Sequence, residues 1–341
     1  MIQLKPINQQ VVVVLGASSG IGRETALQFA RRGAKVVVSA RSESKLASLV
    51  NEIQGFGGEV TPLVIDDVAV FEQVKAIADR TVEVYGRLDT WVHIPATAVF
   101  ATFDNKTPQE FKRVVDVTLM GQVYGAMAAL PHIKREGRGA LIHISSMEGL
   151  RSLPYQSAYS AAKHGVEGFL EAMRVELQHE KIPISVTSIK PAVIDTPFWD
   201  NARTKLGVKP SGIPPYYSAS LVADAILYTA EHPTRDFLVG DAARLLDFLQ
   251  RLSPELVDSL LLLVGFPLQR SEVPKSEDAP NNLYEPVPEH DTIEGSLSDV
   301  LEIPSVSDWL AKNPALKWGA MGGVAALAFL ATQGFRNGDR I

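Results

Sequence analysis

One sequence feature constrains the fold more than any other. A run of β-branched residues ends in a glycine-rich loop, and the loop leads into a helical pattern. Residues 10–16 read QVVVVLG, the loop continues to residue 22 as ASSGIG, and residues 20–32 have the helical pattern. A continuous β-branched run is typical of a strand that is buried on both faces of a parallel sheet. We therefore expect this segment to begin an α/β domain.

The rest of the first 240 residues repeats this alternation of strand and helix. Further strands are predicted at 34–41, 59–66, 88–94, 139–145, 184–191 and 236–240, with helices between them. Strands that alternate with helices of about ten or more residues indicate a parallel sheet covered on both faces. The prediction is a doubly wound, Rossmann-like α/β domain of about seven strands over residues 1–240.

The remaining residues, 241–341, differ in composition. Residues 241–270 are an apolar helical extension with Pro254 and Pro267 as breakers, and residues 271–310 are rich in proline and acidic residues. The second segment is either a linker or an extended strap. Within 311–341, the uncharged stretch 318–335 is just long enough for a membrane helix. We predict membrane association through this helix, with the α/β domain in the cytoplasm. A soluble cytoplasmic protein whose last helix packs on protein is the alternative.

Composition removes several classes of function. The chain has 341 residues, a formal net charge of −6 and no cysteine. An acidic balance argues against nucleic acid as a partner, because phosphate binding requires a basic surface. Disulfides and thiolate metal sites are excluded, and the histidines lack the HExxH spacing, so we expect no metal. The N-terminal residues also lack the pattern of a secretory signal.

The glycine loop predicts a binding site for a pyrophosphate. A turn that joins a strand to a helix directs free backbone N–H groups and the positive end of the helix at one point. Glycine lets the backbone approach the ligand closely. A plain glycine-rich turn without a ligand is the alternative. The candidate contacts are the loop and the helix start: Gly16, Ser18, Ser19, Gly20, Ile21 and Gly22.

The end of the second predicted strand indicates which dinucleotide would bind. An NAD site has an acidic residue here that holds the ribose hydroxyls, whereas this chain has Arg41 and Ser42. A guanidinium favours a ribose 2′-phosphate, so the prediction is NADP(H), with NAD(H) less favoured. After the third strand, Asp67 is the candidate to accept a hydrogen bond from the adenine amino group, and Asp66 is the competing choice.

Three residues complete a pattern that resembles the short-chain dehydrogenase/reductase family. Ser146 ends the fifth strand, Tyr159 follows thirteen residues later, and Lys163 lies four residues further, one helical turn away. The resemblance covers roughly residues 9–240. It is carried by this spacing, by GASSGIG at 16–22 and by KPAVIDTPF at 190–198.

The resemblance implies an oxidoreductase that interconverts an alcohol and a carbonyl by hydride transfer. Tyr159 would be the general acid and base, and Ser146 would hold the substrate oxygen. A free phenol has a pKa of about 10, so Lys163 and the oxidised nicotinamide would have to lower it. Lys163 would also bind the nicotinamide ribose, and Thr196 would contact the nicotinamide carboxamide.

The sequence also departs from the family pattern. DVTLMG places Thr118 where the family often has an asparagine that relays protons, and HIPA at 93–96 replaces Asn-Asn-Ala-Gly. A dinucleotide-binding protein with little turnover therefore remains an alternative, as does a membrane-tethered scaffold. We also expect a homo-oligomer. The substrate loop, 194–215, predicts a small hydrophobic carbonyl or alcohol substrate, because it carries Phe198, Trp199 and Ile213 and is followed by Tyr216.

Overall fold

The first predicted strand, Val11–Leu15 (β1), lies inside a seven-stranded sheet with the order β12-β7-β6-β4-β1-β2-β3. All of the strand pairs in this sheet are parallel. The computed structural model describes residues 2–288, 291–297, 300–301, 308–309 and 312, and Met1–Glu302 form one compact unit. The other strands of the sheet are Lys35–Ala40 (β2), Glu59–Val64 (β3), Thr90–His93 (β4), Gly139–Ile144 (β6), Ile184–Pro191 (β7) and Asp236–Val239 (β12).

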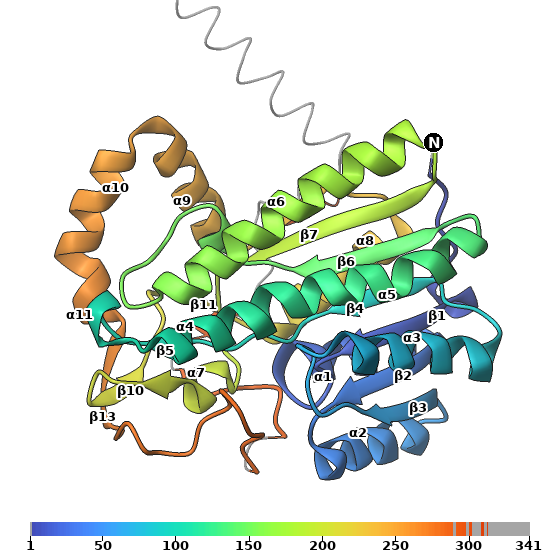
Figure 1. Ribbon diagram of the computed structural model, residues 1–341, viewed down its shortest axis with the longest axis horizontal. Coiled ribbons are helices and arrows are strands. Elements are labelled where there is room, and N and C mark those ends of the chain that lie inside the picture. The colour runs from blue at the N-terminus through green and yellow to red at the C-terminus, as the bar shows by residue number, and fades with distance from the viewer. Residues whose placement is uncertain (1, 289–290, 298–299, 302–307, 310–311, 313–341) are drawn as a thin grey trace, which may run out of the picture. The chain divides into compact units, whose positions relative to one another are not determined.

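The predicted fold is confirmed, and the burial of β1 explains the uniform sequence of that strand. Every residue of β1 is buried, because the sheet is covered by helices on both faces (Figure 1). The neighbours of β1 are β2 on one side and β4 on the other, and the sequence order reverses between β1 and β4. Open α/β sheets bind ligands in the crevice beyond the carboxyl ends of the strands at such a reversal. The glycine loop and residues 94–97 begin at this point.

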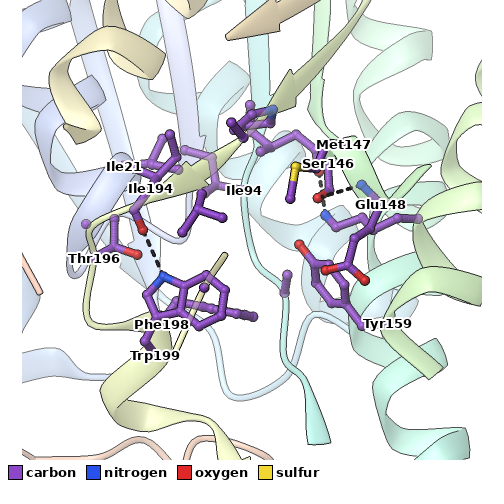
Figure 2. A pocket seen from close by; sticks show the side chains of 18 of the residues that line it. Ile21, Ile94, Ser146, Met147, Glu148, Tyr159, Ile194, Thr196, Phe198 and Trp199 are labelled. Carbon is purple, nitrogen blue, oxygen red and sulfur yellow. Dashed lines mark hydrogen bonds between the residues drawn. The ribbon is translucent and has the colours of Figure 1, made fainter. Parts of the chain in front are cut away.

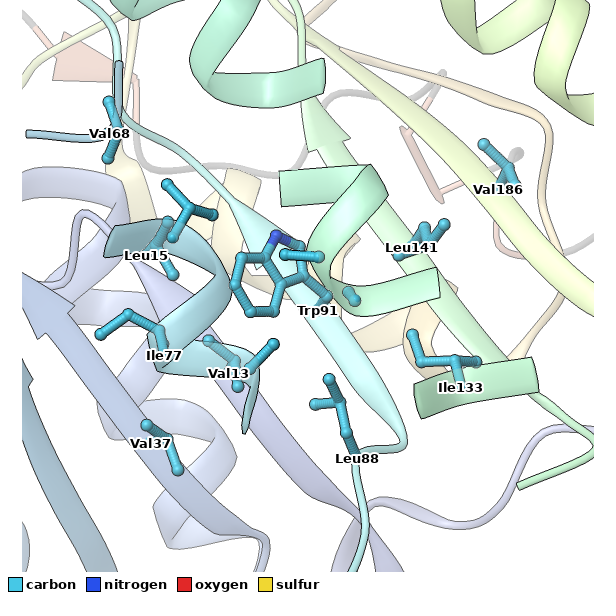
Figure 3. Close-up of a cluster of buried hydrophobic side chains, with 14 of the residues drawn as sticks. Val13, Leu15, Val37, Val68, Ile77, Leu88, Trp91, Ile133, Leu141 and Val186 are labelled. Atoms are coloured by element: carbon cyan, nitrogen blue, oxygen red, sulfur yellow. The ribbon is translucent and has the colours of Figure 1, made fainter. Parts of the chain in front are cut away.

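Two layers of helices enclose the sheet. On one face, Gly20–Arg31 (α1) packs against Ala219–Glu231 (α8), and α1 also touches Glu43–Gly55 (α2). Phe71–Tyr85 (α3), Gly121–Arg135 (α5) and Ser157–His179 (α6) cover the other face (Figure 1). The core on this face gathers around Trp91 of β4 (Figure 3). It includes Val13, Leu15, Ile77, Leu88, Ile133, Leu141 and Val186.

The predicted long helix from Pro108 is interrupted by a π-turn. Pro108–Val115 (α4) begins with a capping box between Thr107 and Glu110, and a π-helical turn at Asp116–Met120 joins it to α5. In the described part of the chain, Pro108–Arg135 is the one helical stretch that is long and apolar enough to cross a membrane. Half of its most apolar window is buried within the protein, as is usual for a core helix.

The chain beyond the sheet continues along the same unit. Asp241–Leu252 (α9) and Pro254–Leu260 (α10) lead through a π-turn at Leu261–Gly265 to Phe266–Leu268 (α11). Arg270–Pro274 (β13) then pairs with Val208–Pro210 (β10). The next residues reach α4 and α1, since the backbone carbonyl of Leu283 accepts a hydrogen bond from Arg113. The predicted membrane stretch, 318–335, lies outside the described residues.

Two glycines provide a test of how tightly the glycine loop packs on α1. A Cβ atom at Gly22 would lie 2.0 Å from the carbonyl oxygen of Gly16, whereas one at Gly168 in α6 would meet nothing within 4 Å. We expect Gly22→Ala to lower the free energy of unfolding by about 1–3 kcal/mol through overpacking. Gly168→Ala should raise it by roughly 0.5–1 kcal/mol, because alanine is the better helix former. Urea titrations of both variants measure this, and equal stabilities would contradict the packing described.

Candidate active site

Two adjoining cavities lie at the carboxyl end of the sheet beside β1 and β4. The larger has a volume of about 210 Å³ and the smaller about 150 Å³. The two cavities share part of their lining, so they form one elongated site. The shared residues come from the glycine loop, from the loop after β4 and from two later segments: Gly16, Ser19, Pro95, Ala96, Asn201 and Asn282.

The glycine loop forms the floor where the cavities meet. Gly16 and Gly20 have φ angles of +83° and +53°, a backbone conformation that favours glycine. Ser19 precedes the first turn of α1, and Gly20 and Ile21 line the larger cavity. Gly22 lines neither cavity and instead lets α1 pack against Gly16. The start of α1 therefore borders the site with the positive end of the helix, and its Gly20 N–H group donates to the carbonyl oxygen of Thr292 over 3.0 Å.

The smaller cavity carries a positive charge. Arg41, Ser42 and Asp67 line it together with Ser18, Lys45 and Arg113. Burial and the charge of Arg113 lower the pKa of Arg41. Asp66 is exposed and lies outside the lining, so the structure places Asp67 at the site, where Arg113 donates to its Oδ2 atom over 2.6 Å. Ser42 also caps α2 by accepting a hydrogen bond from Lys45 N.

The larger cavity brings Ser146, Tyr159 and Lys163 together. Figure 2 shows Ser146 and Tyr159 on one wall and Thr196 across from them. Lys163 is fully buried, its Nζ donates to the carbonyl oxygen of Ile144 over 2.6 Å, and it lies 5.4 Å from the centroid of the Tyr159 ring. The Oγ atom of Ser146 accepts a hydrogen bond from Glu148 N over 3.1 Å, and Ser146 also forms a hydrogen bond with Tyr159.

Burial is the largest influence on the pKa values of Tyr159 and Lys163. Tyr159 lines the cavity and is half-buried. Burial, followed by the charge of Glu148, raises the pKa of the phenol. A hydrogen bond with Ser146 acts in the opposite direction. Burial lowers the pKa of Lys163 to about 7, although the negative charges of Glu167 and Glu148 act to raise it. The sequence analysis expects Lys163 and the oxidised nicotinamide together to lower the pKa of Tyr159, and among the protein's own groups Lys163 is not one that shifts this pKa.

Glu148 is a site residue that the sequence analysis missed. It lines the larger cavity, is 4% exposed, and accepts a hydrogen bond from Ser160 Oγ over 2.6 Å. Burial raises the pKa of its carboxyl group to about 8. Its position two residues after Ser146, in a loop after a buried strand, was the available signal. Gln156, Asn201, Gln269 and Asn282 were also missed, and they come from segments that only the fold brings together.

Thr118 and His93 lie behind the site rather than in it. The hydroxyl of Thr118 accepts from Thr97 N and donates to Thr97 O, both over 3.1 Å, and Thr118 borders neither cavity. It therefore holds the loop after β4 in place. His93 is buried, stacks on His143 with a centroid distance of 6.1 Å, and has no hydrogen-bond partner for either ring nitrogen among the described residues.

The predicted substrate loop supplies part of the apolar wall. Phe198, Trp199 and Ile213 line the larger cavity, and the indole N–H of Trp199 donates to the carbonyl oxygen of Ile194 over 2.9 Å. Tyr216 does not line the cavity, because its hydroxyl group donates to the carbonyl oxygen of Gly212.

The buried carboxyl group of Glu148 predicts a pH-dependent stability. Its folded pKa of about 8 lies above the ordinary value of 4.5, so the folded protein holds a proton that the unfolded chain loses as the pH rises. The free energy of unfolding should therefore fall through this window. Glu148→Gln keeps the shape but cannot ionise, so its stability should exceed that of the unaltered protein by an amount that grows with pH, on the order of 2 kcal/mol. Urea titrations between pH 5 and pH 8 test this, and parallel profiles would contradict it.

Comparison with known proteins agrees with this geometry. The sequence profile described as short chain dehydrogenase matches residues 10–207. The uncharacterized oxidoreductase YxnA of Bacillus subtilis strain 168 is 38% identical over 286 residues, which cover 83% of this chain and 80% of YxnA. The 3-oxoacyl-[acyl-carrier-protein] reductase FabG of Thermotoga maritima is 31% identical over 196 residues, which cover 58% of this chain and 78% of FabG.

A solved structure has the same fold. The alcohol dehydrogenase of the archaeon Thermococcus sibiricus, complexed with 5-hydroxy-NADP, matches 67% of this chain and 95% of its own, with a TM-score of 0.59 and 24% identity. The profile match covers the glycine loop, Ser146, Tyr159 and Lys163. The chain belongs to the short-chain dehydrogenase/reductase family of oxidoreductases.

Proposed function

We propose that this protein is an NADP-dependent oxidoreductase that interconverts an alcohol and a carbonyl group on a small hydrophobic substrate. The observation that carries the proposal is that Ser146, Tyr159 and Lys163 line the same cavity as Gly16 and Gly20. A dinucleotide whose pyrophosphate binds at the start of α1 would therefore end beside the Tyr159 hydroxyl.

The residues of the larger cavity fit this chemistry. The bound cofactor supplies the hydride. Ser146, which hydrogen-bonds Tyr159 in this structure, donates its hydroxyl hydrogen to the substrate oxygen and orients it when substrate is bound. Tyr159, a neutral phenol in this cavity, donates the proton that the developing alkoxide requires. Lys163 offers ammonium hydrogens to the nicotinamide ribose. Thr196 lies across the cavity and contacts the nicotinamide carboxamide.

The charge of the smaller cavity supports NADP(H) over NAD(H). Its lining has three basic side chains, Arg41, Lys45 and Arg113, and Asp67 as the acidic one. A ribose 2′-phosphate adds negative charge that such a set attracts. The apolar wall of Phe198, Trp199 and Ile213 supports a hydrophobic substrate. FabG is named a 3-oxoacyl reductase, which supports a carbonyl as the reacting group.

We also propose that the protein associates with membranes. Several large apolar side chains of α9–α11 face solvent, and the chain continues into the uncharged stretch 318–335. Exposed apolar side chains are suited to contact with lipid. The exposed set is Leu245, Phe248, Leu252, Leu262, Leu263 and Leu268.

Replacement of the phenol tests the catalytic assignment. Tyr159→Phe keeps the ring but removes the proton donor, so turnover of a reducible carbonyl should fall at least about 100-fold, within the range of general acid catalysis. NADPH affinity should change little. Tyr228→Phe, on α8 away from both cavities, is the matched control and should keep full turnover. A Tyr159→Phe enzyme with near-normal turnover would show that another group supplies the proton, and a protein that binds NADPH but turns over no carbonyl would favour the binding-protein alternative.

Charge reversal at Arg41 tests the cofactor preference. We expect the unaltered protein to bind NADPH at least several-fold more tightly than NADH, and Arg41→Asp to reduce or reverse this ratio, because a carboxylate repels the 2′-phosphate. Arg80→Asp makes the same charge change at an exposed position on α3 and should leave the ratio intact. Fluorescence titration of both dinucleotides measures the ratio. Equal affinities in the unaltered protein would contradict the assignment.

Membrane association is tested by fractionation of the full-length chain. We expect the protein to pellet with membranes at low and at high salt and to be released by detergent, because the attachment is apolar. Substitution of Leu262 and Leu263 by serine should shift part of the protein to the supernatant. Full recovery of the unaltered protein in the supernatant without detergent would contradict the proposal and favour a homo-oligomer that covers this face.

A further inference from the structure

A segment outside the family match borders both cavities. We call residues 281–288 and 291–297 the strap. Asn282 of the strap lines the larger and the smaller cavity, and Pro286 and Val287 line the smaller one. The profile match ends at residue 207, so the strap lies outside it, as does Gln269, which also lines the larger cavity.

The basic side chains of the smaller cavity bind the strap backbone. Arg41 donates to the carbonyl oxygens of Tyr284 and Asn282 over 3.0 and 3.1 Å. Lys45 Nζ donates to the carbonyl oxygen of Val287 over 2.7 Å. Arg113 Nε donates to Leu283 O over 2.9 Å. Hydrogen bonds from charged donors are stronger than neutral ones, so these contacts fix the strap over the cavity.

An apolar anchor accompanies these polar contacts. Leu283 is 1% exposed and packs with the buried residues Val99, Ala101, Val114 and Ala158. Burial of such a side chain contributes about 1.5–3 kcal/mol. Beside it, the Asn282 side chain accepts a hydrogen bond from Thr97 Oγ1 over 3.0 Å, and Asn282 N donates to Asn201 O over 2.8 Å.

The other end of the strap reaches the nicotinamide side of the site. The N–H group of Gly20 donates to Thr292 O over 3.0 Å, and Leu297 N donates to Asp195 Oδ1 over 3.0 Å. A Cβ atom at Gly295 would lie 2.4 Å from Thr196 O, so the backbone lies directly against the loop after β7. The strap thus follows the whole length of the site, from Arg41 past the glycine loop to Thr196.

We propose that the strap is part of the cofactor site and forms the outer wall that encloses the bound dinucleotide, with Asn282 in contact with it where the two cavities meet. The proposal rests on the proposed function. Gly16, Ser19 and Asn282 line both cavities, so the strap bounds the same space as the glycine loop, and it touches the start of α1 at Gly20. Exchange of the cofactor then requires the strap to leave its anchors, and release is slow.

A charge introduced at Leu283 tests whether the strap encloses the bound cofactor. Leu283→Asp places a carboxylate in an apolar cluster and should detach the strap, so the rate of NADPH dissociation in stopped-flow displacement should rise at least tenfold. Val273→Asp is the matched control, because Val273 is 56% exposed on β13 of the same extension. It should release NADPH at the rate of the unaltered protein. Thermal unfolding of each variant establishes that the domain is folded.

Hydrogen exchange on the unaltered protein tests the same inference without any substitution. Amides of residues 281–288 and 291–297 should exchange more slowly when NADPH is bound, and amides of 270–274 should not change. Faster exchange in the strap on NADPH binding would show that the cofactor expels the strap, and this would overturn the inference.

The two proposals fail in different ways. Suppose that the unaltered protein binds NADPH and reduces carbonyls, but Leu283→Asp is folded and releases NADPH at the control rate. The inference that the strap encloses the cofactor is then wrong, and the proposed function stands. If Leu283→Asp does not fold, the exchange measurement decides between a wall and an expelled segment. If the unaltered protein binds neither NADPH nor NADH, the proposed function is overturned, and the inference with it.

Discussion

The parallel pairing of β1 with β4 is the interaction on which the site depends. Leu15 at the end of β1 is aligned with His93 at the end of β4, so the loops that follow both strands leave the sheet at one edge. One loop supplies the glycines and the start of α1, and the other supplies Pro95 and Ala96. A shift of this register by one residue would exchange the side chains on the two covered faces of the sheet and move the two loops apart.

Burial, more than any single charge, sets the chemistry of the larger cavity. It raises the pKa of Tyr159 and of Glu148 and lowers that of Lys163, so each group is biased toward its neutral form. A neutral phenol is ready to donate a proton to a carbonyl under reduction. The reverse reaction needs the phenolate, and a cation bound in the cavity would stabilise it. The pKa of Tyr159 would therefore depend both on its burial in the protein and on the positive charge of a bound cofactor.

Local sequence patterns predicted the fold and the grouping of Ser146, Tyr159 and Lys163 at one cavity, because each depends on neighbours in the chain. The β-branched run of β1, the glycine loop and the spacing from Ser146 to Lys163 are of this kind. Other features depend on contacts between distant segments, so the periodicity of the sequence does not predict them. These features are the role of Thr118, the pKa of Tyr159, and the lining of the cavities by Glu148 and Asn282. The composition of 271–310 permitted a linker or a strap, and only the packing of Leu283 against residues 99–158 shows the strap.

Titration of Tyr159 with and without NADP⁺ tests directly whether this residue shares a cavity with the cofactor. The absorbance of ionised tyrosine is followed against pH for the unaltered protein and for Tyr159→Phe, and the difference between them isolates this residue. Tyr159 should ionise only at high pH in the free protein, and at a distinctly lower pH once the positively charged nicotinamide is bound. An unchanged titration in the presence of saturating NADP⁺ would contradict it, because Tyr159 would then not share a cavity with the cofactor.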